Sequence, residues 1–117
     1  SDDEETILHV LESILTKTLP KQSQLLPNYP NPFNPETWIP FRAAKDGNAS
    51  VTIYDINGTI IRFLPIGYVL AGNYLEPDKA IYWDGKTDAG EYVSSGTYFY
   101  RIKLVDYTET RKMVIVK

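Results

Sequence analysis

The pattern of apolar and polar residues changes its period along the 117-residue chain. Over residues 3–19 apolar side chains recur every three or four positions, which predicts an amphipathic helix that Asp2 or Asp3 can cap and Pro20 ends. Its apolar face consists of Ile7, Val10, Leu11, Ile14 and Leu15. A single helix of this length is marginal in water, so this face is expected to pack on the domain, on a second copy of the chain, or on a preceding region.

Residues 20–40 contain six of the chain's eight prolines, with Asn28, Asn31 and Asn34 between them. A helix or a central strand cannot pass through such a run. The segment also contains large apolar side chains such as Tyr29 and Phe33, which would be costly to expose. We therefore expect it to follow a fixed path against a core.

From Trp38 onward the period becomes two, which is typical of strands. Pro40 favours an edge strand at 38–42, and Asn57-Gly58 is a hairpin signal between strands 49–56 and 59–64. Further strands are expected at 80–83, 97–104 and 110–116. The pattern predicts an all-β domain, an antiparallel β-sandwich of about seven strands over residues 21–117, preceded by one amphipathic helix within residues 1–20.

Composition narrows the function classes. The chain has no cysteine and one histidine, His9, which excludes thiol chemistry and makes a Ser–His–Asp triad implausible. Residues 1–20 carry five acidic side chains and one basic one, whereas the other 97 residues carry ten acidic and eleven basic ones. Without a basic stripe we expect no nucleic-acid binding, and without a long apolar run no membrane span. The expected protein is a non-enzymatic binding module without a cofactor.

The loop at residues 83–91 contains three carboxylates, on Asp84, Asp88 and Glu91. Calcium prefers oxygen-rich loops, but this spacing does not match the twelve-residue EF-hand loop. Two successive turns explain the same residues, because Asp accepts backbone N–H bonds and Gly adopts positive φ. We expect turns rather than a metal site, with these three carboxylates as the ligands if calcium binds.

Five stretches occur in an order that resembles a known family. They are residues 26–37 (LPNYPNPFNPET), 53–58 (IYDING), 82–86 (YWDGK), 95–100 (SGTYFY) and 112–117 (KMVIVK). The set resembles the C-terminal sorting domains of the type IX secretion system and the similar Ig-like domain of flagellar hook-capping proteins. The resemblance covers residues 25–117 and leaves out the predicted helix.

This resemblance implies an Ig-like fold that acts as a folded signal at the C-terminus of an exported bacterial protein. The implied partners are an outer-membrane translocon and a sortase-like surface peptidase, and the implied location is secreted or cell-surface, reached through the periplasm. The residues of this chain that match the family's motifs are Asn31, Pro32, Phe33, Asn34, Pro35, Gly96, Tyr98, Lys112, Met113, Val114, Ile115, Val116 and Lys117.

Alternatives remain at each motif. Residues 31–35 could form a docking surface, but rigid packing explains each residue type and is favoured. The strand at 110–116 is apolar on both faces, so it is either buried or an edge to which a partner strand adds. The chain could also be a structural or adhesion module that self-associates through its helix. A third hypothesis is glycan binding by exposed Trp38, Trp83 and tyrosines.

Overall fold

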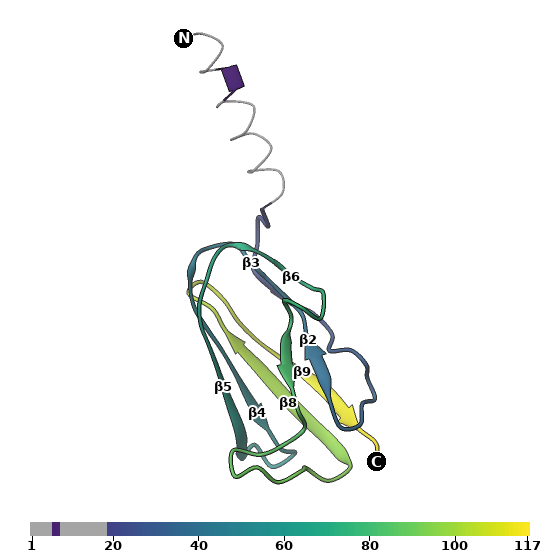
Figure 1. The fold of residues 1–117 in the computed structure, drawn as a ribbon. Coiled ribbons are helices and arrows are strands. Elements are labelled where there is room, and N and C mark those ends of the chain that lie inside the picture. The colour runs from purple at the N-terminus through teal and green to yellow at the C-terminus, as the bar shows by residue number, and fades with distance from the viewer. Residues whose placement is uncertain (1–5, 8–18) are drawn as a thin grey trace.

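The computed structural model describes Thr6, Ile7 and residues 19–117 and shows an all-β fold (Figure 1). Its strands are β1 (Gln24–Leu25), β2 (Thr37–Ile39), β3 (Phe41–Ala43), β4 (Gly47–Tyr54), β5 (Ile60–Val69), β6 (Gly72–Tyr74), β7 (Ile81–Trp83), β8 (Gly96–Lys103) and β9 (Thr108–Ile115). One layer is a four-stranded antiparallel sheet in the order β5-β4-β8-β9. The three-stranded sheet β1-β3-β6 and the pair β2-β7 together cover its inner face.

Two parts of the predicted fold class need correction. The described residues form nine strands in three sheets rather than the one sandwich of about seven strands that was predicted, because short strands form where the sequence indicates loops; the two packed layers still fit a β-sandwich. No helix is among the elements of the described residues, so the predicted helix is not part of the observed fold. Most of that prediction, 3–5 and 8–18, falls on residues outside the described part. The part that is described also contains no helix that could span a membrane.

Pro40 divides the predicted edge strand in two. On its N-terminal side β2 pairs with β7, and on its C-terminal side β3 pairs with β1 and β6. Pro40 has no amide hydrogen to donate, but its carbonyl accepts a 3.1 Å bond from the Leu26 amide. The proline is buried and lies where the chain passes from one sheet to the other.

The Asn57-Gly58 hairpin is observed between β4 and β5. Asp55 Oδ1 accepts hydrogen bonds from the amides of Asn57 and Thr59, and Gly58 has a φ of 81°. The return strand continues to Val69, five residues beyond the predicted end, with a register shift opposite Pro65 and Gly67. An edge strand tolerates both residues because its outer side needs no ladder partner.

The core lies between the layers and is rich in large side chains. Trp83, Tyr100, Leu25, Ile39, Val51, Ile53, Ile102 and Met113 are fully buried. Tyr100 also fastens the proline-rich segment, since its hydroxyl accepts from the Asn28 amide (3.0 Å) and donates to the Leu26 carbonyl (2.9 Å). This segment is therefore part of the packed domain, as its apolar residues predict.

Candidate functional site

Phe33 joins the first motif of the chain to the last. Its side chain is buried, 2% exposed, and its ring centroid lies 5.7 Å from that of Trp83. Its amide donates to the Val114 carbonyl (3.0 Å), and its carbonyl accepts from the Val116 amide (3.1 Å). The segment thus forms a short parallel bridge with β9 at Ile115.

Asn31 extends the same contact. Its Oδ1 accepts a 3.0 Å bond from the amide of Val114, the N–H of β9 on the side away from β8. Residues 31–33 therefore occupy the edge of β9 at Val114–Val116. Of the two alternatives that the sequence left open for this strand, the structure shows the edge position, but this part of the edge is already paired within the chain.

The Trp83-Asp84-Gly85 stretch packs against the same segment. Gly85 has a φ of +79°, and a Cβ placed there would lie 2.2 Å from the Pro35 carbonyl oxygen. Trp83 is fully buried, donates from Nε1 to the Lys86 carbonyl (2.9 Å) and meets Tyr98 at 6.4 Å between ring centroids. Burial of Trp83 contradicts the idea that it stacks on a sugar, because stacking needs an exposed ring face.

The Ser95–Tyr100 stretch supplies the other side of this cluster. Tyr98 pairs in register with Met113 of β9, and its hydroxyl donates to the Ser94 carbonyl (2.8 Å). Gly96 begins β8 with a φ of 151° and lies opposite Ile115. Met113 and Ile115 are buried, whereas Lys112, Val116 and Lys117 are exposed.

Several side chains around this cluster are exposed. Together with the half-buried Lys86 we call them the motif surface, which consists of Asn31, Pro32, Asn34, Pro35, Lys86, Tyr92, Val116 and Lys117. Its two ends meet at Tyr92, whose ring centroid lies 4.9 Å from the Lys86 Nζ and 5.3 Å from the Lys117 Nζ. The Lys117 amide also donates to Ser95 Oγ (2.9 Å). The surface thus presents prolines, asparagine amides, and the ammonium groups of two lysines that lie over a tyrosine ring.

The loop at 84–91 covers the edge of β5. Asp84 lies 3.4 Å and Asp88 3.7 Å from the Arg62 guanidinium, and Asp88 Oδ1 also accepts from the Phe63 amide (3.1 Å). Glu91 does not join them: its backbone amide bonds to Thr87. Across the described ranges no three acidic or histidine side chains gather as a metal site would require. Arg62, which the sequence analysis did not single out, organises this loop.

Tyr82 has the largest pKa shift of the described groups. Its hydroxyl donates to Glu36 Oε2 (2.6 Å), and this hydrogen bond, together with desolvation, raises the pKa of Tyr82 to about 12. Trp38 lies between Tyr29 and Tyr82, with centroid distances of 6.3 Å and 5.5 Å. These rings form a partly exposed aromatic row beside β2 and β7 rather than isolated stacking platforms.

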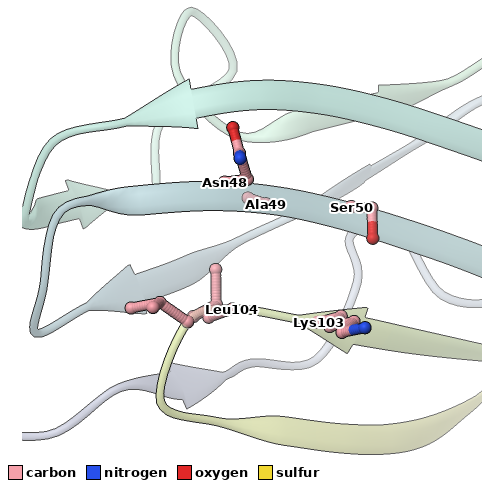
Figure 2. A pocket seen from close by; sticks show the side chains of 6 residues that line it. Asn48, Ala49, Ser50, Lys103 and Leu104 are labelled. Carbon is pink, nitrogen blue, oxygen red and sulfur yellow. The ribbon is translucent and has the colours of Figure 1, made fainter.

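A hollow of about 380 Å³ lies at the other end of the four-stranded sheet (Figure 2). Asn48, Ala49 and Ser50 of β4 line one side, and Lys103 and Leu104 line the other. Lys103 is the charged group in this lining, and no carboxylate is among the residues that line the hollow. The motifs do not reach this hollow, so the motif surface remains the candidate site.

Of the predicted helix face, only Ile7 belongs to the described residues, and it is 59% exposed. The other members of that face, Val10, Leu11, Ile14 and Leu15, lie outside them. Sequence reasoning also missed Asn28, which is buried and donates from Nδ2 to Thr37 Oγ1 (3.0 Å). Asn28 lies between Pro27 and Tyr29, in a segment without helical or strand periodicity, so the pattern of the sequence does not indicate that it is buried.

Among solved structures, the fold is similar to that of dimeric latent PorU from Porphyromonas gingivalis, with a TM-score of 0.58 and 23% identity over 80% of this chain. The chain spans 9% of the PorU chain. FlgD from P. aeruginosa aligns over 62% of this chain and 54% of its own, with a TM-score of 0.47 and 25% identity. No family model and no curated protein matches the chain. The likeness to PorU shows a shared fold.

Proposed function

We propose that the chain is a non-enzymatic C-terminal sorting and anchoring domain of an exported bacterial protein. In this proposal a type IX-like system carries the protein from the periplasm through the outer membrane, to be secreted or held at the cell surface. The resemblance of five ordered motifs to sorting domains supports it, as does a fold shared with part of PorU. An outer-membrane translocon would read the motif surface, and a sortase-like surface peptidase would act after export.

One observation carries the proposal. Motifs that lie as far as 83 residues apart in sequence converge at one end of the domain, where Asn31 and Phe33 hydrogen-bond to β9. Packing accounts for the buried residues of this cluster. It does not account for the residue types of the exposed side chains of Pro32, Val116 and Lys117, which are accessible to a receptor.

Export of a fusion protein tests the proposal. Residues 1–117 are fused to a reporter with a signal peptide in a type IX-competent host and in a strain that lacks the translocon. We expect surface or medium reporter only in the competent strain, and a loss of export when Val116→Asp and Lys117→Glu are introduced together. Lys45→Glu, on an exposed site outside the motif surface, is the matched control. Export that is equal in both strains and unchanged by the surface substitutions would contradict the proposal.

A structural or adhesion module is the second candidate. The observation in its favour is that Phe33, Gly85 and Tyr98 are each fully explained by packing, which a scaffold needs as much as a signal does. In that case the fusion protein would be folded in the periplasm but not exported, and charge changes on the motif surface would have no effect.

A further inference from the structure

The two outer strands of the four-stranded sheet are protected to different extents. Along β5 the Asp88 amide donates to the Ile61 carbonyl (2.9 Å), and Asp88 Oδ1 accepts from the Phe63 amide (3.1 Å). Pro65 follows two residues later and has no amide hydrogen to offer. A loop and a proline therefore block the pairing groups of this edge.

The edge of β9 is covered at one end only. Val114 uses its amide and carbonyl on Asn31 and Phe33, so both groups point away from β8. In an antiparallel ladder the backbone amide and carbonyl groups of every second residue point to the same side. The groups of Thr108, Thr110 and Lys112 therefore also point away from β8. Among the described residues, no backbone group outside the ladder bonds to these three. An open window of pairing groups therefore runs along residues 108–112.

This window is complementary to itself. We propose that it pairs antiparallel with the same window of a second copy of the chain, about a two-fold axis at Thr110, joining two four-stranded sheets into one. In this register Thr108, Thr110 and Lys112 face Lys112, Thr110 and Thr108 of the partner subunit. All of them are outward-pointing residues, so their amides and carbonyls can bond in pairs.

The side chains select this register. Glu109 lies opposite Arg111 of the partner subunit, and by symmetry Arg111 lies opposite Glu109 of the partner subunit, which gives two opposite-charge pairs. Thr110 faces its own equivalent, and no like charges oppose one another. Moving the axis by two residues, to Thr108 or Lys112, places Glu109 or Arg111 opposite an uncharged side chain and loses both pairs.

The surroundings set the length of the window, and β1 lies close to β9 where Arg111 Nε donates to the Leu25 carbonyl (3.0 Å). The Leu104 amide bonds to the Tyr107 carbonyl (2.8 Å), so the chain turns back toward β8 just before Thr108. At the other end the Asn31–Phe33 cover begins at Val114. A hollow of about 310 Å³ beside the window is lined by Gln22, Ser23, Gln24, Leu25, Tyr107, Glu109 and Arg111. It can receive the charged side chains of a second copy.

A cysteine placed on the axis tests the geometry. The chain has no native cysteine, so Thr110→Cys introduces a single thiol. Directly opposed Cα atoms in such a pair are about 5.5 Å apart, which a disulfide can span. We expect a covalent dimer of the full chain under mild oxidation. Thr52→Cys, on the same face of central strand β4, should stay monomeric on a denaturing gel.

Charge variants test the pairing by sedimentation velocity over a range of concentrations. Glu109→Arg places like charges across both pairs and should weaken dimerisation about tenfold or more. The swap of Glu109→Arg with Arg111→Glu should restore it. The swap cannot restore the bonds that these residues make within one copy, from Tyr107 Oη to Glu109 and from Arg111 Nε to the Leu25 carbonyl. Recovery therefore reports contact between copies.

Two results would overturn the inference: a monomer at every concentration, or a dimer that Glu109→Arg leaves unchanged and Thr110→Cys does not trap. The second result would place the interface on another part of the chain. Circular dichroism of each variant separates a lost dimer from a lost fold. The dimer is independent of export, so failure of the proposed sorting function would leave this measurement intact.

Discussion

At Gly85 the backbone and a neighbouring carbonyl leave no space for a side chain. Its φ of +79° already favours glycine, and the Pro35 oxygen lies 2.2 Å from the place of a Cβ. Gly90 has a similar φ of +85° but nothing within 4 Å of that place. The two glycines thus separate the cost of a left-handed backbone from the cost of a collision.

Gly85→Ala should therefore destabilise the domain by more than Gly90→Ala. The conformational cost common to both is about 1–2 kcal/mol, and the collision at Gly85 adds displacement of Pro35. Urea denaturation of the two variants and the parent measures the difference. Equal losses of unfolding free energy would show that Pro35 moves aside freely.

Tyr82 gives the domain a pH dependence in the alkaline range. Its pKa is raised to about 12 in the folded state by the hydrogen bond to Glu36, against an ordinary value of 10.0. The folded state therefore retains a proton that the unfolded chain releases, and this contribution to stability is complete below pH 10 and is lost as the pH rises to about 12. Tyr82→Phe should remove the highest-titrating phenolate from an absorbance titration. Tyr68→Phe, at an exposed site, should leave it.

At the scale of elements, the structure uses irregular segments to cover strand edges. Residues 31–33 run beside the end of β9, and residues 84–88 run beside β5. Each cover combines a side-chain oxygen that accepts a strand amide with backbone bonds. These edges would otherwise invite unspecific pairing, so the loops do the work that a further strand would do.

Asn31→Ala should release the Val114 amide. The lost hydrogen bond costs about 1 kcal/mol, and hydrogen exchange at Val114 should quicken while exchange at Ile53 in β4 stays slow. Asn34→Ala is the matched control, since the Asn34 side chain is exposed and forms no hydrogen bond within the described part of the chain. Unchanged protection at Val114 would show that the backbone bonds of Phe33 suffice.

Local signals in the sequence predicted local structure well. Asn57-Gly58 and the alternation on either side of it predicted the β4–β5 hairpin, and the aromatic residues of the proline-rich segment predicted that it packs on the core. The prediction of one edge strand at 38–42 was wrong, because a proline in an alternating segment is equally compatible with an edge strand and with a break between two sheets. Strand β6 contains Gly72 and Asn73, residue types that favour a loop. They form a strand because they pair with Ala43 and Arg42, which are distant in the sequence. The bond from Phe33 to β9 has no local signature.

At the scale of the whole molecule, Phe33 connects the proline-rich segment near the start of the domain to its last strand. It contacts Trp83 in β7 and bonds to Val114 and Val116 at the C-terminal end. A domain of this size is stabilised by only about 5–15 kcal/mol in total. A single buried contact between distant motifs is therefore a large share of what holds them together.

Phe33→Ala should cost about 3–5 kcal/mol of unfolding free energy and, under the proposed function, weaken export together with the fold. Phe63→Ala, at a site 48% exposed, should cost much less. Thermal unfolding followed by circular dichroism gives the comparison. An export-defective Phe33→Ala protein with unchanged thermal stability would instead mean that the ring itself is recognised.

The bond between residues 31–33 and Val114–Val116 also bears on quality control at the membrane. A polypeptide that is released early, or clipped before Val114, leaves Asn31 and Phe33 without the groups that hold them in place. If a receptor binds the motif surface, it does not bind such a molecule, even though most of the core sequence is intact. The receptor then selects only cargo proteins whose domain is complete and folded.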